Sequence, residues 1–159
     1  MNINEVKNIH ERKQYHFINY VKNNNVVSLK PGVYRLIKEL QKQKVRQFIV
    51  TSSSKKQAKL LTNQLFKEFK PFEFIISSND VQFCKPNPLP YLKAMNLSGI
   101  KFNKSIVFED SIPGLRSSLA AKLPTIYVPS NIPAVIEKDM NLDCFVDSLG
   151  NEGLSLIHI

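Results

Sequence analysis

The chain is 159 residues long, 43% of its residues are hydrophobic, and its formal net charge at pH 7 is +9. This length suffices for one domain with a hydrophobic core, and no apolar run approaches the roughly 20 residues that a membrane-spanning helix needs. The positive charge could attract nucleic acid, but the lysines are scattered and no aromatic residues alternate with them, so we expect neither a nucleic-acid nor a membrane partner.

The hydrophobic pattern predicts two helices followed by alternating strands and helices. Apolar or long side chains recur every three to four residues over 1–26, and Pro31 is well placed to begin a second helix with an apolar stripe from Val33 to Leu40. The further expected elements are, in order, strand 45–51, helix 54–69, strand 72–77, helix 88–97, strand 104–109, helix 112–122, strand 124–128, a short helix 132–139 and strand 143–147. This alternation predicts an α/β fold in which helices cover both faces of a parallel sheet.

Polar segments follow three of the expected strands. Thr51–Ser54 come after the first strand, Lys85 lies in the loop beyond the second, and Glu109 and Asp110 end the third. Because functional sites in parallel sheets gather at the carboxyl ends of the strands, we expect these residues to form one site.

Glu109 and Asp110 are the candidate metal ligands. Mg²⁺ prefers hard oxygen ligands and keeps several waters, and two adjacent acids after a buried strand are costly without a counter-ion. We expect Asp110 to bind the ion directly and Glu109 to bind it directly or through water. The alternative is that Asp110 or Ser111 merely caps the following helix.

Ser52 and Lys85 are the candidate phosphate ligands. The Ser52 hydroxyl and the backbone N–H groups after it could hold a phosphate at a helix N-terminus, although hydroxyl residues often only cap helices, and Thr51 and Ser53 compete for the same role. Pro86 keeps Lys85 extended in its loop, where a fixed cation could neutralise a phosphate and a nearby carboxylate nucleophile. Away from the other two segments, Lys85 would be read as a surface lysine.

Together these segments resemble a known family. Segments 50–54, 85–91 and 108–115 are similar to motifs two, three and four of the haloacid dehalogenase superfamily, most of all to its sugar-phosphatase and beta-phosphoglucomutase-like branch, which includes CbbY-type proteins. Residues 28–33 resemble the linker that returns from the helical cap of that branch to its core, and residues 9–13 resemble the last cap helix. The resemblance covers about residues 5–150 and implies a Rossmann-like three-layer α/β/α core.

The resemblance also implies a mechanism. In this family an aspartate attacks the phosphorus, and water hydrolyses the resulting aspartyl-phosphate while Mg²⁺ and a lysine balance the charge. By the matching motifs, Ser52 and its neighbour Ser53 would bind the transferred phosphoryl group, Lys85 would be the catalytic lysine, and Asp110 and Glu109 would hold Mg²⁺. The expected full-length protein is a monomeric, Mg²⁺-dependent phosphatase of a small phosphorylated sugar or related metabolite.

One motif of the family is missing. Its first motif is an Asp-x-Asp pair at the end of a central first strand, but this chain has no Asp-x-Asp and its first aspartate is Asp80. We therefore expect an N-terminally truncated fragment that is inactive alone. In it, strands 45–51 and 104–109 would either expose unpaired edges or pair with each other.

The expected domains follow from the same resemblance. Residues 1–27 would be a remnant of the helical cap, 28–150 the Rossmann-like core without its first strand, and 151–159 a tail. Residues 154–159 match the in-frame translation of an adapter used in sequencing libraries, so we expect them to be an artefact and assign His158 no role; the alternative is a short apolar tail.

A second departure from relatives is Lys122, which stands where they usually carry Gly at the end of a helix. A left-handed C-cap at this position would cost a lysine about 1 kcal/mol of backbone strain.

The expected compartment is the cytoplasm. The N-terminus lacks the basic-then-apolar layout of a signal peptide, and Cys84 and Cys144 form neither a CxxC pair nor a disulfide framework.

Three alternatives to the phosphatase remain. One is a beta-phosphoglucomutase-like phosphomutase of the same fold, and another is a non-catalytic Rossmann-like binding domain. A phosphoacceptor receiver domain is disfavoured, because its acid pair precedes its lysine, whereas here Glu109 and Asp110 follow Lys85.

Overall fold

The computed structural model describes residues 2–24, 27–129, 144–146 and 149. Its helices are α1 (Ile3–Asn23), α2 (Val33–Lys42), α3 (Lys55–Leu65), α4 (Leu89–Ser98) and α5 (Ile112–Ala120). Its strands are β1 (Phe48–Val50), β2 (Phe74–Ile76), β3 (Val107–Glu109), β4 (Thr125–Tyr127) and β5 (Cys144–Phe145). Each expected element that falls on described residues is present, most with shorter bounds, while α4 is shifted by one residue and α2 extends two residues past the predicted stripe. The expected helix 132–139 lies outside the described residues.

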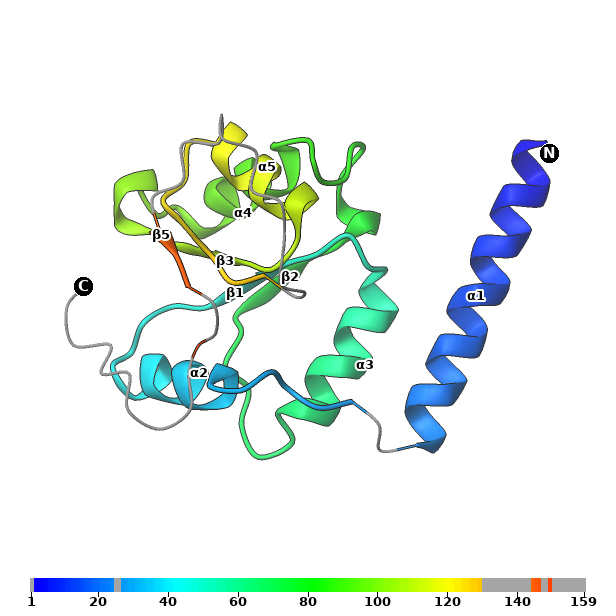
Figure 1. The fold of residues 1–159 in the computed structure, drawn as a ribbon, viewed down its shortest axis with the longest axis horizontal. Coiled ribbons are helices and arrows are strands. Elements are labelled where there is room, and N and C mark those ends of the chain that lie inside the picture. The colour runs from blue at the N-terminus through cyan, green and yellow to red at the C-terminus, as the bar shows by residue number, and fades with distance from the viewer. Residues whose placement is uncertain (1, 25–26, 130–143, 147–148, 150–159) are drawn as a thin grey trace.

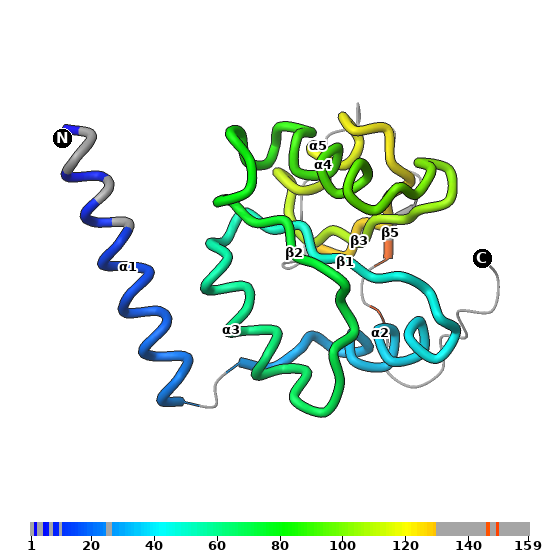
Figure 2. Tube along the Cα trace, turned by 180° about the vertical axis from the view of Figure 1, so that it is seen from behind, coloured from blue at the N-terminus to red at the C-terminus, as the bar shows by residue number. Residues whose placement is uncertain are grey.

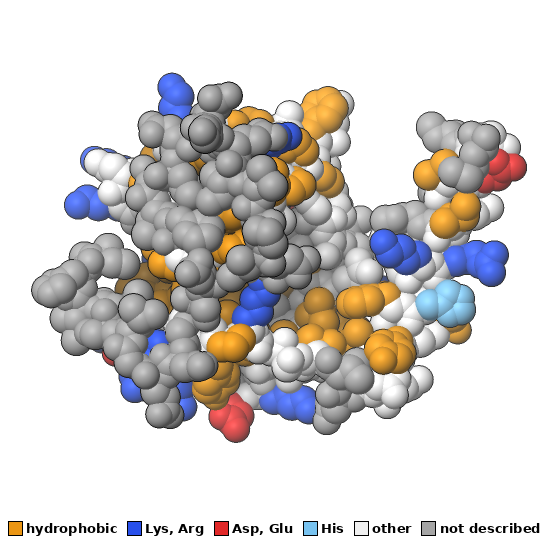
Figure 3. Space-filling model, in the orientation of Figure 1, with side chains coloured by type: hydrophobic (Ala, Val, Ile, Leu, Met, Phe, Trp, Pro, Cys, Tyr) orange, Lys and Arg blue, Asp and Glu red, His pale blue; other side chains and the backbone are white. Residues whose placement is uncertain are grey.

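The elements form three layers. Helices α4 and α5 lie on one side of the strands and α2 and α3 on the other, while α1 stands apart beside α3 (Figures 1 and 2). This confirms the predicted α/β class with helices on both faces of parallel strands. None of the described helices is both long and apolar enough to cross a bilayer. On the face shown in Figure 3, the Lys and Arg side chains lie apart from one another rather than in one patch.

The strands form two separate parallel sheets. β1 pairs with β2, so that Phe48 lies opposite Phe74 and Val50 opposite Ile76. The other sheet has the order β3-β4-β5. β1 and β3 are not hydrogen-bonded to each other, so among the described strands the predicted alternative with two unpaired edges is the one observed.

The two sheets nevertheless share a core beneath α4 and α5. Its buried residues are Tyr91, Met95, Ala121 and Leu123. Val50 of β1 and Val107 of β3 both pack against this cluster. The common apolar layer therefore holds β1 and β3 over the same helices although no ladder joins them.

Helix α3 ends earlier than the sequence pattern predicts. It stops at Leu65 instead of residue 69, and the buried aromatic residue is Phe66, whereas Phe69 lies beyond the helix. The reason is an aromatic cluster: the Phe66 ring lies 5.4 Å from the Phe72 ring and 5.6 Å from the Phe69 ring, measured between centroids. Packing of these rings against one another replaces another helical turn.

The predicted left-handed helix end at Lys122 is confirmed. Its φ angle is 59°, and Leu123 N–H reaches back to the Ser118 carbonyl at 3.1 Å, which closes α5 in the manner of a Schellman motif. Lys44 ends α2 in the same way with φ 58°. Both lysines occupy a conformation that favours glycine.

Candidate active site

The polar segments after β1 and β3 meet at one cavity. It has a volume of about 500 Å³ and lies at the carboxyl ends of these strands. All the predicted site residues line it: Ser52, Ser53, Lys85, Glu109 and Asp110. The structure therefore brings together the residues that the motifs singled out, while the role of each residue stays a prediction.

Lys85 is held at the cavity wall by three groups. Its side chain is only 9% exposed and forms an ion pair with Glu109. The Nζ group also donates to the Val50 carbonyl at 2.9 Å and to the Tyr91 hydroxyl at 3.2 Å. Its ammonium therefore joins the end of β1 to the end of β3. A cis peptide bond links Lys85 to Pro86.

Glu109 points toward Lys85 and the start of α5. Its side chain is 5% exposed, and one carboxylate oxygen accepts hydrogen bonds from both Lys85 and the Tyr91 hydroxyl. The other oxygen lies 3.4 Å from Ser111 Oγ. Gly114 leaves the room for this arrangement, because a Cβ atom there would overlap the Glu109 carboxylate.

Tyr91 is the buried third member of this group. The residue is 5% exposed. Burial, and then the negative charge of Glu109, raise the pKa of its phenol well above the usual range, so the hydroxyl keeps its proton and can donate it in a hydrogen bond.

Asp110 lies more openly than its neighbour. Its side chain is 56% exposed, and Oδ2 lies 3.4 Å from the Lys30 ammonium. Its oxygen atoms are of the hard type that Mg²⁺ prefers. The described residues include no cluster of three or more His, Cys, Asp or Glu side chains, so Asp110 and Glu109 would form only a part of any Mg²⁺ site.

Ser52 and Ser53 lie exposed just before α3, and neither caps the helix. The N-cap is Ser54, whose side chain accepts a hydrogen bond from the Gln57 backbone. Ser53 N–H donates to Thr51 Oγ1 at 3.1 Å. The capping alternative for Ser52 is therefore excluded in this structure, and Ser52 lines the cavity.

Sequence reasoning missed several residues around this site. Lys13 and Gln14 of α1 line the cavity together with the core loops, so helix α1 contributes one wall. Their place depends on how α1 packs against the rest of the chain. The helical pattern of residues 1–26 carries no signal for that packing.

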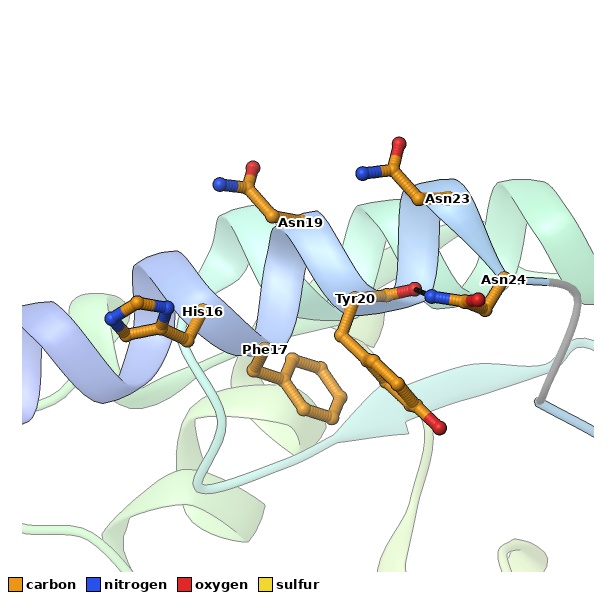
Figure 4. Close-up of a pocket in the computed structure, with 6 residues that line it drawn as sticks. All are labelled: His16, Phe17, Asn19, Tyr20, Asn23 and Asn24. Atoms are coloured by element: carbon orange, nitrogen blue, oxygen red, sulfur yellow. Dashed lines mark hydrogen bonds between the residues drawn. The ribbon is translucent and has the colours of Figure 1, made fainter.

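A second hollow, of about 580 Å³, lies along the C-terminal half of α1. Figure 4 shows its six lining residues, all from this helix or its cap, with the Asn24 side chain donating to the Tyr20 carbonyl at 3.0 Å. It gathers no pair of charged side chains, so the cavity at the strand ends is the candidate active site.

A parallel α/β fold with polar side chains gathered at the carboxyl ends of its strands is typical of Rossmann-like proteins. The model of the haloacid dehalogenase-like hydrolases matches residues 2–128. The chain belongs to this family, as its motifs predicted.

The similarity of the chain to individual proteins is consistent with its membership in this family. The chain is 30% identical over 130 residues to Protein CbbY of Rhodobacter capsulatus, covering 79% of this chain and 56% of the relative. It is 27% identical over 121 residues to a phosphorylated carbohydrates phosphatase of Thermotoga maritima, covering 76% and 53%. The crystal structure of CbbY from Rhodobacter sphaeroides in complex with phosphate superposes with a TM-score of 0.81 at 25% identity, covering 91% of this chain and 64% of that one. The chain thus spans little more than half the length of these curated relatives.

Proposed function

We propose that the chain is part of a Mg²⁺-dependent phosphatase that hydrolyses a small phosphorylated sugar or related metabolite through an aspartyl-phosphate intermediate. The observation that carries the proposal is the meeting of Ser52, Lys85 and Asp110 at one cavity. A hydroxyl, a cation and a carboxylate are the groups needed to hold a phosphoryl group and its metal. The relative named as a phosphatase of phosphorylated carbohydrates supports the substrate class.

Each residue has a proposed part. Ser52 and Ser53 donate hydrogen bonds to the phosphoryl oxygens, and the Lys85 ammonium, within the cavity wall, balances negative charge near them. Asp110, with Glu109 beside it, would hold Mg²⁺, which when bound neutralises charge on the phosphate. Lys13 adds a positive charge on the α1 wall, which favours an anionic substrate.

The nucleophile is not among these residues. Because the chain contains no Asp-x-Asp, we propose that a segment outside the 159 residues supplies both the attacking carboxylate and the acid that protonates the leaving alkoxide. The place for it is indicated by the unpaired edges of β1 and β3, whose ends both line the cavity. The 159-residue chain alone should release no phosphate. A cytoplasmic, monomeric full-length protein stays a prediction.

The test is a chimera. A segment with the family's first motif, a strand that ends in Asp-x-Asp, would be joined to this chain before α1. Phosphate release is then measured over a panel of sugar phosphates with Mg²⁺ and with EDTA. We expect Mg²⁺-dependent release that Lys85→Met and Asp110→Asn each abolish, and none from a matched chimera with Asn-x-Asn.

The outcomes separate the alternatives. A folded chimera that yields an isomeric sugar phosphate and no free phosphate would be a phosphomutase. A folded chimera that binds sugar phosphates without turnover would support the non-catalytic binding domain and refute the phosphatase.

A further inference from the structure

The two adjacent carboxylates at the end of β3 face different surroundings. Glu109 is 5% exposed and has contacts with Lys85, Tyr91 and Ser111, whereas Asp110 is 56% exposed at the cavity. A carboxylate whose oxygens already accept hydrogen bonds from buried partners has little capacity left for a metal ion. The pair is therefore divided: Asp110 lies open to the cavity, and Glu109 faces the protein.

Resting on the proposed function, we propose that Tyr91 is a positioning residue that, together with Glu109, fixes the ammonium of Lys85 at the wall of the active site. The Tyr91 hydroxyl accepts from Lys85 at 3.2 Å and donates to the Glu109 oxygen with which Lys85 is paired. It closes a ring of three hydrogen-bonded groups.

The Tyr91 ring adds to the effect of its hydroxyl. Lys85 Nζ lies 4.9 Å from the centroid of the ring, within the range of a cation–π contact. With the Val50 carbonyl at 2.9 Å, the ammonium thus has acceptors for all three of its N–H bonds inside the protein. A lysine held in this way keeps one position instead of sampling many rotamers, so its charge stays beside the phosphoryl site without an entropy cost at each turnover.

Gly114 belongs to the same arrangement. It packs against the Glu109 carboxylate, and any side chain there would push the carboxylate away from Lys85 and Tyr91. The Tyr91 hydroxyl therefore binds the Glu109 carboxylate, and Gly114 leaves the space that this carboxylate occupies.

The test follows the Lys85 ammonium itself, so it needs no turnover. In ¹⁵N-labelled chain, the Nζ–Hζ signal of Lys85, assigned by its loss in Lys85→Met, should be visible, because buried hydrogen-bonded protons exchange slowly with water. Tyr91→Phe removes the hydroxyl but keeps the ring, and should speed this exchange about two- to tenfold, the equivalent of one lost hydrogen bond. Thr125→Val, which removes another fully buried hydroxyl that bonds Ser118 and Leu123 instead, should leave the exchange unchanged.

Three results would overturn the proposal. One is a Lys85 signal that exchanges too fast to be seen in the unaltered chain. Another is a folded Tyr91→Phe variant whose Lys85 exchange matches that of the unaltered chain, which would leave Tyr91 a packing residue. The third, which serves if Tyr91→Phe does not fold, is a Glu109→Gln variant with unchanged Lys85 exchange. If the chimera described above fails to hydrolyse phosphate esters but Tyr91→Phe speeds the exchange, the proposed function fails and the positioning role stands.

Discussion

Removing both partners of the buried Lys85–Glu109 pair should destabilise the chain less than the sum of the two single removals. The two side chains are 9% and 5% exposed, so either charge left alone would stay largely out of water. Breaking such a pair from one side costs about 3–5 kcal/mol, because the remaining charge is uncompensated. Lys85→Met also leaves the Val50 carbonyl without its Lys85 hydrogen bond, which places this variant at the upper end of that range.

The double variant Lys85→Met/Glu109→Gln leaves no buried charge at this place. Its cost should therefore be smaller than the sum of the two single costs, with an interaction energy of about 2–3 kcal/mol. For a protein stabilised by about 5–15 kcal/mol, these differences are large enough to measure.

The assay is urea unfolding of the four proteins at pH 7, followed by circular dichroism, with Arg46→Met/Glu73→Gln and its single variants as the control cycle. Arg46 and Glu73 also form an ion pair, with donor and acceptor 2.7 Å apart, but both side chains are more than 40% exposed. The control cycle should show much weaker coupling, since exposed pairs contribute little. Additive costs for Lys85→Met and Glu109→Gln would refute the reasoning, because they would mean that the two charges do not compensate each other in the folded chain.

Three further predictions concern other parts of the chain. Lys122→Gly should stabilise it by about 1 kcal/mol, seen as a rise of about 2–4 °C in Tm, because glycine adopts the left-handed helix end without strain; an unchanged Tm would count against strain at this residue. A hydrogen bond from Lys55, and then one from Ser77, lower the pKa of Asp80 to about 2, so this carboxylate contributes stability above its ordinary pKa of about 3.9 that is lost as pH falls toward 2. Asp80→Asn should reduce the fall in unfolding free energy between pH 5 and pH 2, and an equally steep fall would contradict the assignment. In titration calorimetry, Lys30→Gln should tighten Mg²⁺ binding about two- to fivefold by removing the cation that neighbours Asp110, and weaker binding would show that Lys30 does not compete with the metal.

The order and type of the elements could be predicted because each leaves a periodic apolar pattern. Their ends could not, since they depend on neighbours distant in the sequence. The strand expected over 45–51 extends only over Phe48–Val50, where β2 supplies hydrogen bonds on one side. The helix expected to reach residue 69 stops at Leu65, because Phe66 is buried with aromatic residues from beyond the helix. The pattern of the helix alone contains neither partner.

The candidate site was predicted as a set of positions, but its internal contacts were not. The rule that sites form at the carboxyl ends of parallel strands suffices to bring Ser52, Lys85 and Asp110 together. It does not tell which way a side chain turns at a strand end. Glu109 was expected to bind the metal directly or through water, which stays a prediction, and its contacts with Lys85 and Tyr91 were not foreseen. The six-residue spacing from Lys85 to Tyr91 does not by itself show that both side chains meet the Glu109 carboxylate at the end of β3.

The division of the sheet and the incomplete chemistry occur at the same place. Val50 of β1, Thr51 after it, and Phe108 and Glu109 of β3 line the cavity. These two strands have no hydrogen-bonded partner strand on the sides where the described sheets stop. A strand added between them would satisfy backbone groups of both, and its carboxyl end would arrive beside the Lys85 ammonium, which already joins the ends of β1 and β3. The segment proposed to supply the nucleophile would therefore also supply sheet stability. The two contributions can be separated, because a strand with Asn-x-Asn in place of Asp-x-Asp keeps its backbone hydrogen bonds while it loses the attacking carboxylate.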